Sequence, residues 1–445
     1  GSFLVAARYS LVGLLGAGAG GTSATPNYSD LSFNVDFGKS KAGNFSLFGI
    51  LGTSDIDFLG DDIDETDLFA AEDEDLFVRS KFVASGIKHQ FQLNENTYWR
   101  SIASVSFSES NITANRFINK DTPQERQILF TDSDNIENRL AISTLLNSKF
   151  SNRFTLRSGV LWERFTIESF LRDRLEQPDN DGDGDPDLFT FRDFDESLSI
   201  FQPFVQGQWR LSEKLTLNTG LHGQYATINK QWVVEPRLSA EYSLSDTQSI
   251  SAGYGLHHQL IPLPILFLNE TINGQNVQTN RNLDFVRSNH FVLGYNLVPA
   301  PNWRAKLEVY YQNISKAAVE PLPSSYSSLT EGADFVFDND RVSLVNEGRG
   351  YNTGVEITLE RFFYNGFYGL LTGSFFESKY TGSDGIERNT PFNNQYVTNL
   401  LAGKEFTIGA KQQNVLFFDT RISFSGGRFY TPVDLEASRN AGFEI

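Results

Sequence analysis

The stretch NWRAKLEVYYQNIS, Asn302 to Ser315, decides the fold class. Its side chains divide between two faces of a strand: Trp303, Ala305, Leu307, Val309 and Tyr311 on one, and Arg304, Lys306, Glu308, Tyr310 and Gln312 on the other. This period of two residues is typical of a β-strand with one apolar and one polar face. Two surroundings would suit the apolar face, namely the core of a soluble sandwich or lipid.

The same alternation recurs along the chain. Clear examples are Lys214–Ala226, Gly354–Phe362 and Asn414–Ser425, and no segment carries a helical apolar stripe of useful length. The pattern predicts an all-β protein.

Composition excludes several classes of protein. The 445 residues carry a formal net charge of −18, which argues against nucleic acid as a partner. No window approaches the ~18 uninterrupted apolar residues of a membrane helix. Because the chain has no cysteine, disulfides, zinc–thiolate sites and thiol nucleophiles are excluded.

Short and long connections alternate between the predicted strands. The short ones are Gly38–Gly43, Asn94–Asn96, Ser151–Arg153, Ser212–Lys214, Ser245–Thr247, Ala300–Asn302, Tyr364–Gly366 and Gly409–Gln412. The others are Gly16–Asn27, Thr53–Leu76, Asn111–Asn135, Arg172–Asp195, Ile261–Val286, Lys316–Gly348, Thr381–Pro391 and the brief Asn229–Trp232. This order is typical of a transmembrane up-and-down antiparallel β-barrel, with short periplasmic turns and long extracellular loops. The apolar face is therefore predicted to contact lipid.

The number of strands bears on where the barrel closes. We count about 17 strands, whereas single-chain bacterial barrels have even numbers. The first strand, Phe3–Leu15, and the last, Asn414–Ser425, are both expected to run outward. The chain also lacks Met and shows no signal peptide, so we interpret residues 1–445 as one partial outer-membrane barrel domain of a longer protein.

The C-terminal third resembles a known family. The segments that carry the resemblance are SSYSSLTEGADF (Ser324–Phe335), LVNEGRGYNTGVEITLERFF (Leu344–Phe363), SFFESKYTGSDGIERNTPFNNQYVTNLLAGKEF (Ser374–Phe406), GGRFYTPVDLEASRNAG (Gly426–Gly442) and YGLHHQLIPL (Tyr254–Leu263). They are similar to the barrel of a subgroup of TonB-dependent receptors.

This resemblance implies a barrel of about 22 strands around an N-terminal plug. The plug, the TonB-contacting segment, the first four strands and the last strand would then lie outside the chain. It further implies energised uptake of a bulky ligand bound by extracellular loops, with TonB, outer-membrane lipid and lipopolysaccharide as partners. The alternative is a non-transporting scaffold or docking subunit of a larger outer-membrane complex, with a surface lipoprotein or another outer-membrane protein as partner.

No motif predicts an enzyme or a required cofactor. GAGAGG (Gly16–Gly21) fits a dinucleotide fingerprint, but a loop and not a helix follows it. His257 and His258 are adjacent, so on a strand they point to opposite faces and cannot bind one metal together.

Several charged residues are predicted on the polar faces of strands. Lys306, Glu308, Glu356, Glu360 and Arg421 are expected to face the lumen, either as cross-strand pairs or as contacts to a substrate or plug. The run Ser54–Asp75 carries eleven acidic and no basic residues; it is interpreted as a solvated loop, with a cation-collecting rim as the alternative.

The run DNDGDGDPD, from Asp179 to Asp187, predicts a calcium-binding loop. Asp179, Asp181, Asp183 and Gly184 fit the start of an EF-hand loop, and the candidate ligands are Asp179, Asp181, Asp183, Asp185 and Asp187. The run also resembles the calcium repeats of thrombospondin-type domains. Thr190 stands where the bidentate acid is expected, so the competing interpretation is a flexible acidic tip.

Overall fold

The computed structural model describes residues 1–10, 26–62, 71–174, 178–180, 182, 184–331, 341–411 and 413–429. The chain divides into two compact units. Unit 1 comprises Gly1–Gly207, His222–Val234 and Pro262–Asn282, and unit 2 comprises Gln208–Leu221, Glu235–Ile261 and Leu283–Ile445. Strands β8 (Phe189–Arg210), β9 (Leu215–Ala226) and β10 (Gln231–Ser245) contribute residues to both units.

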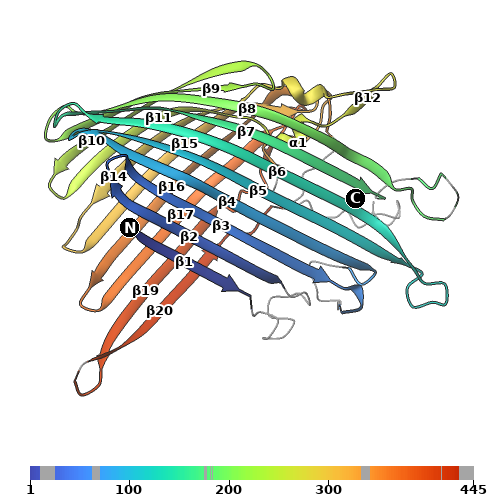
Figure 1. Ribbon diagram of the computed structural model, residues 1–445, viewed down its shortest axis with the longest axis horizontal. Coiled ribbons are helices and arrows are strands. Elements are labelled where there is room, and N and C mark those ends of the chain that lie inside the picture. Colours follow the sequence, from blue (N-terminus) through green and yellow to red (C-terminus); the bar gives the residue numbers. More distant parts are fainter. Residues whose placement is uncertain are drawn as a thin grey trace. The chain divides into compact units, whose positions relative to one another are not determined.

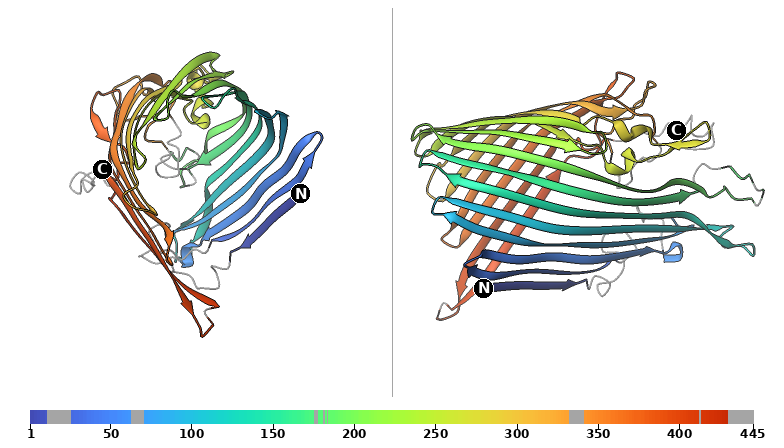
Figure 2. Two further views of the ribbon diagram at one scale, coloured as in Figure 1. Left: turned by 90° about the vertical axis from the view of Figure 1, so that its left-hand side faces the viewer. Right: turned by 45° about the horizontal axis from the view of Figure 1, so that its top comes forward.

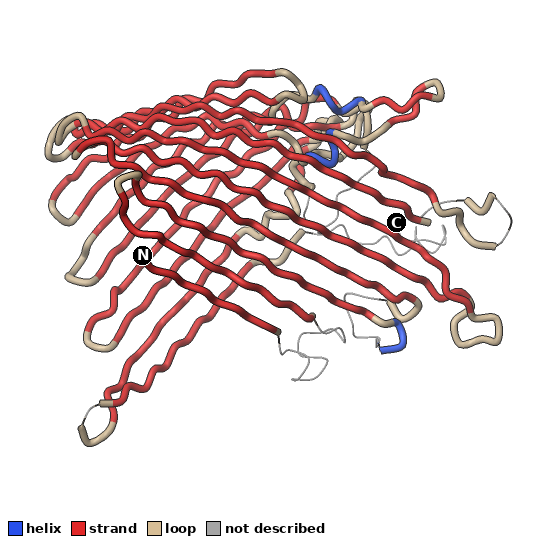
Figure 3. Tube along the Cα trace, viewed as in Figure 1, coloured by secondary structure: helices blue, strands red, loops and turns tan. Residues whose placement is uncertain are grey.

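Strands make up most of the described structure (Figure 3). Of the twenty strands in the described residues, seventeen have between 8 and 24 residues. The other three, β12 (Glu270–Ile272), β13 (Gln275–Val277) and β18 (Glu387–Asn389), have three residues each and belong to connections. The prediction of an all-β chain with about 17 long strands is therefore confirmed.

Helical segments are short and lie in connections. They are η2 (Gly60–Asp62), α1 (Leu263–Leu266) and η3 (Thr279–Asn282). Within the described ranges, no helix has the length and apolar character needed to cross a membrane.

Unit 1 contains strands that pair antiparallel in sequence order (Figure 1). They are β1 (Ser2–Tyr9), β2 (Asn27–Ser40), β3 (Gly43–Phe58), β4 (Glu74–Asn94), β5 (Thr97–Ile118), β6 (Arg126–Lys149) and β7 (Phe154–Asp173). Each neighbouring pair is an up-and-down hairpin, as the alternating connections predict.

Unit 2 has the same meander in its own strands (Figure 2). They are β11 (Gln248–Gln259), β14 (Val286–Leu297), β15 (Trp303–Val319), β16 (Val345–Tyr364), β17 (Phe367–Thr381), β19 (Tyr396–Ile408) and β20 (Asn414–Ser425), with most of β10. The hairpin β16–β17 turns at Asn365 and Gly366, whose φ angles of 54° and 70° are both positive, as a tight hairpin turn requires.

Several strands extend further than the sequence predicts. Asn111–Asn135 was expected to be a loop, but β5 continues to Ile118 and β6 begins at Arg126. The predicted loops at Thr53–Leu76 and Arg172–Asp195 are shortened in the same way. These extensions contain many polar residues among their apolar ones, and in β5 a register shift between Ala114 and Asn115 interrupts the alternation on which the expected boundaries rest.

The strand register of unit 2 collects the apolar positions of successive strands on one face. Directly opposite residues of an antiparallel pair lie on the same face of the sheet. One cross-strand row contains Ala252, Leu293, Val309, Val355, Phe375 and Tyr396. The neighbouring row contains Tyr295, Leu307 and Ile357. We call the side of these rows the apolar face of unit 2 and the opposite side its polar face.

The apolar face is exposed, and the buried apolar side chains lie elsewhere. Leu307, Val309 and Ile357 have 41, 44 and 44% of their residue surface accessible. In unit 1, by contrast, Ile265, Leu266 and Phe267 in and beside α1 are almost fully buried. Apolar side chains that are exposed on the outside of a sheet are expected where the sheet faces lipid, because lipid and not protein then covers them.

Candidate functional site

The five charged residues predicted on polar strand faces all lie on the polar face of unit 2. The register places Glu308 opposite Glu356, Lys306 opposite Thr358 and Arg304 opposite Glu360. One further row joins Glu360, Leu370, Leu401 and Arg421 across four strands. The period-two pattern in the sequence therefore correctly predicts that these five residues lie on one face of the sheet.

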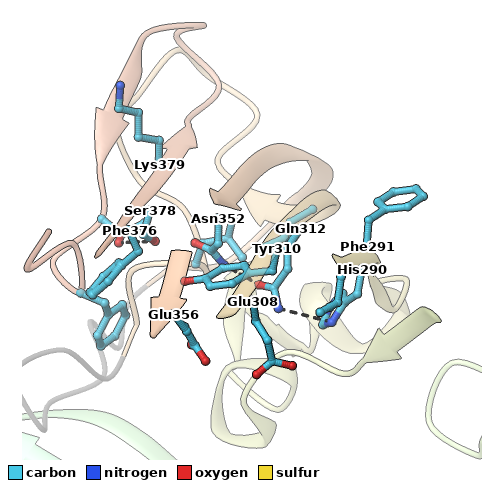
Figure 4. Close-up of a pocket in the computed structure, with 15 residues that line it drawn as sticks. His290, Phe291, Glu308, Tyr310, Gln312, Asn352, Glu356, Phe376, Ser378 and Lys379 are labelled. Carbon is cyan, nitrogen blue, oxygen red and sulfur yellow. Dashed lines mark hydrogen bonds between the residues drawn. The ribbon is translucent and has the colours of Figure 1, made fainter. Parts of the chain in front are cut away.

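A cavity of about 600 Å³ opens on this polar face (Figure 4). We call it the polar-face cavity. Its wall comes from β14, β15, β16 and β17, and its lining residues are His290, Phe291, Val292, Glu308, Tyr310, Gln312, Ile314, Leu329, Asn352, Glu356, Phe376, Ser378, Lys379, Thr390 and Phe392. A concave site with apolar and aromatic walls and a few polar groups is typical of ligand pockets.

The two carboxylates of the cavity differ in their partners. Glu308 forms an ion pair with Lys306, two residues earlier on the same face. Glu356 has no ion pair within the described part of the chain. The cation of the lining, Lys379, extends away from both glutamates in Figure 4, and its Nζ lies 3.4 Å from Glu387 Oε1 and 3.9 Å from Glu377 Oε1.

Tyr310 contributes an aromatic ring to the cavity wall, two residues after Glu308 on the same face of β15. It lies directly opposite Gly354, and a Cβ built on that glycine would be 2.7 Å from the Tyr310 hydroxyl oxygen. The missing side chain therefore lets the ring lie against the neighbouring strand. Any larger residue at this position would displace the ring.

Loop residues close one side of the cavity. Leu329 comes from the connection after β15, and Thr390 and Phe392 come from the connection after β17. Backbone hydrogen bonds join the two connections: the amide of Asp384 donates to the Ser324 carbonyl at 3.2 Å. The Ser383 hydroxyl also donates to the Leu322 carbonyl at 2.6 Å.

Two loop carboxylates near these contacts have lowered pKa values. The Arg388 guanidinium beside Asp384 holds the pKa of that carboxyl below its usual range, with hydrogen bonds of 3.0 and 2.7 Å. A hydrogen bond from Ser324, with Arg341 as a second donor, lowers the pKa of Glu320. Both connections are therefore held by charged contacts at neutral pH.

Three histidines of unit 2 contact residues of neighbouring strands. His257 packs against His290 of the next strand, with ring centroids 4.5 Å apart, and Gln312 contacts His290 Nδ1 at 3.3 Å. His258 Nδ1 instead lies 3.5 Å from Glu235 Oε1. His290 was missed in the sequence because its neighbour belongs to another strand, and nothing local signals that contact.

The predicted calcium loop is described only in part. Asp181 and Asp183 lie outside the described residues. Asp179 accepts hydrogen bonds from the amides of Gly182 and Gly184 at 2.7 and 3.0 Å. Asp185 is buried and ion-paired with Arg126, and no cluster of three or more metal-binding side chains occurs within the described ranges.

Three basic residues outside the acidic run Ser54–Asp75 form ion pairs with its carboxylates. Its residues 63–70, like the glycine motif at Gly16–Gly21, lie outside the described residues. Asp55 and Asp57 pair with Arg79, Asp61 pairs with Lys120 and Glu74 pairs with Arg116. Part of the run is strand and not loop, since β3 continues to Phe58.

Comparisons with known proteins identify the family. The model of the family described as "TonB dependent receptor-like, beta-barrel" matches residues 10–444. No curated protein matches the sequence.

Solved structures share the fold. The chain is similar to the ferric-catecholate import receptor Fiu of E. coli K12, with 11% identity, a TM-score of 0.64, and coverage of 92% of this chain and 65% of that one. For the pyoverdine outer membrane receptor FpvA of Pseudomonas aeruginosa PAO1 the values are 12%, 0.62, 90% and 63%. For the ferric yersiniabactin uptake receptor FyuA of Yersinia pestis they are 10%, 0.61, 96% and 64%.

The chain thus spans just under two thirds of the length of these three receptors. The family match, however, extends over nearly the whole chain. It agrees with the antiparallel meander and with the apolar and polar faces of its strands. The chain belongs to the TonB-dependent receptor-like β-barrel family and is an outer-membrane protein.

Proposed function

We propose that this chain forms part of the barrel wall of a TonB-dependent receptor, and that this receptor takes up a bulky ligand across the outer membrane. The family match over residues 10–444 carries the proposal. The polar-face cavity supports it, since loop residues that would face the outside contribute to its lining. Two of the similar receptors are named for ferric-catecholate import and ferric yersiniabactin uptake, and we propose import here without assigning a ligand of that kind.

The proposal assigns roles to residues and partners. The polar face of unit 2, with Lys306, Glu308, Glu356, Glu360 and Arg421, lines the lumen, and the apolar face contacts lipid and lipopolysaccharide. TonB supplies the energy through a segment outside this chain. The protein performs no chemistry on its ligand and requires no cofactor; calcium in the loop Asp179–Asp187 would order that loop only.

The alternative function is the docking of a partner protein, and one similar solved structure is itself a complex with a protein. The solved structure of the FpvAI–pyocin S2 complex shows FpvAI, which has a similar fold, bound to a protein. In the docking role, the loops would bind a surface lipoprotein or another outer-membrane protein without transport.

An uptake experiment separates the two. Cells with the receptor, cells without it and cells without TonB are grown in the same medium, and mass spectrometry follows which compounds disappear. The import proposal expects at least one compound to be depleted only when both receptor and TonB are present. Equal depletion in all three strains, with stable co-purification of a partner protein, would establish the docking role instead.

A further inference from the structure

We propose that the polar-face cavity selects a ligand that carries a cationic nitrogen on a planar aromatic or apolar body. The inference rests on the proposed function and names the substrate class for that site. Its starting point is the juxtaposition of Glu308 and Glu356 beside Tyr310 on one wall of the cavity.

The two glutamates impose an unfavourable charge arrangement on the empty protein. They are directly opposite each other on β15 and β16, and in Figure 4 their carboxylates point to the same side. Like charges at directly opposite positions destabilise a sheet. A cation between them would convert this repulsion into attraction.

Within the described residues, only one of the two glutamates has a cation beside it. Lys306 pairs with Glu308, whereas Lys379 points away from the pair and contacts Glu377 and Glu387. Glu356 therefore presents a carboxylate to the cavity without a cation beside it in the described structure. A cationic group of a ligand would offset this remaining negative charge.

The rest of the lining suits the body of such a ligand. Tyr310, Phe376 and Phe392 contribute aromatic rings, and Gln312 and Asn352 contribute amides that are already hydrogen-bonded to each other at 2.8 Å. Aromatic faces attract cations and stack on planar groups. A volume of about 600 Å³ is in the range of pockets for drug-sized molecules.

An anionic ligand is disfavoured by the same observations. Its negative groups would meet Glu308 and Glu356 with no unengaged cation in the lining to offset them. The formal net charge of −18 adds long-range repulsion of anions and attraction of cations.

The test measures binding of two fluorescent probes to the complete receptor that contains this chain, purified in detergent. The cationic probe is proflavine, a planar aromatic cation, and the anionic probe is anilinonaphthalene sulfonate. We expect proflavine to bind more tightly, and Glu356→Gln to weaken it by about tenfold or more, since a charge-assisted contact is lost. Tyr310→Leu should weaken proflavine by about threefold, through loss of the ring contact.

Matched variants keep the result interpretable. Glu360→Gln changes the same residue type on the same strand and face but outside the cavity, and it should leave proflavine binding unchanged. Glu308→Gln should have a smaller effect than Glu356→Gln, because Lys306 already neutralises Glu308.

Three results would overturn the inference: no proflavine binding to the complete receptor, equal effects of Glu356→Gln and Glu360→Gln, or tighter binding of the anionic probe. The first would mean that another segment of the receptor fills the cavity. None of them affects the uptake experiment, which does not depend on ligand charge. TonB-dependent uptake combined with any of these results would leave the proposed function intact and remove the ligand class.

Discussion

The acidic run of unit 1 and the glutamate pair of unit 2 look alike as negatively charged stretches, but they differ in their cations. In the acidic run, carboxylates form ion pairs with Arg79 on β4, Arg116 on β5 and Lys120 in the connection after β5. In the polar-face cavity, Glu308 has Lys306 and Glu356 has no such partner in the described residues. The number of acidic residues is therefore a poor guide to a binding site. A carboxylate that faces a cavity without its own cation is a better one.

That comparison depends on the two faces of unit 2 having different surroundings, and the largest predicted effect tests this. Ile357→Arg places a charge on the apolar face and should lower the free energy of unfolding by about 2–4 kcal/mol if the position is near the bilayer midplane. Glu360→Arg, three residues away on the polar face, should cost much less. The measurement is denaturant unfolding of the complete receptor in lipid vesicles, and equal costs at both positions would contradict the face assignment.

The calcium loop is a third acidic region, where the counter-charge would come from an ion. With a dissociation constant of ~10⁻⁴–10⁻³ M, as in extracellular modules, about 1 mM calcium should stabilise the protein by ~0.4–1.4 kcal/mol. Calorimetry should detect binding that Asp181→Ala combined with Asp183→Ala abolishes and that Asp61→Ala leaves intact. An absence of heat at millimolar calcium would refute the site.

A smaller effect sharpens the contrast between the two acidic regions. Glu356→Gln removes the repulsion with Glu308 and should raise the free energy of unfolding of the ligand-free protein by about 0.2–1 kcal/mol. Asp57→Asn removes a partner of Arg79 and should bring no such gain. Chemical denaturation of both variants decides the point; a loss of stability in Glu356→Gln would show that Glu356 already has a favourable partner.

The smallest predicted effect concerns pH and the loop contacts beside the cavity. Because Arg388 lowers the pKa of Asp384 below the ordinary value of 3.8, the contact stabilises the loop above that value and is lost as pH falls through the lowered pKa. Limited proteolysis between Gly382 and Phe392 should therefore accelerate only in strong acid. Asp384→Asn should show the faster cleavage already at neutral pH, and an unchanged rate would contradict the assigned role.

The sequence predicts the strands well where two different environments flank them. In β15 the alternation of Leu307 and Val309 with Lys306 and Glu308 predicts both the strand and its two faces. The ends of the strands are predicted less well. Asn111–Ile118 was interpreted as a loop although it continues β5, because a register shift between Ala114 and Asn115 interrupts its alternation.

The cavity depends on information that no local pattern contains. Glu308 and Glu356 are opposite each other only because of the β15–β16 register, and a long connection separates these two strands. A tight turn such as Asn365–Gly366 predicts register, but a long loop does not. The same holds for His257 and His290, which meet across β11 and β14 without a signal in either segment.

The most direct measurement uses the absence of cysteine from this chain. Single substitutions Glu356→Cys, Ile357→Cys, Thr358→Cys and Leu359→Cys are labelled with a fluorescent thiol reagent in the complete receptor in vesicles. Quenching by lipid-attached nitroxide is then compared with quenching by aqueous iodide. The account predicts strict alternation, with iodide quenching at 356 and 358 and lipid quenching at 357 and 359. Iodide quenching at all four positions, or the reversed alternation, would contradict a lipid-facing apolar side and a water-facing polar side.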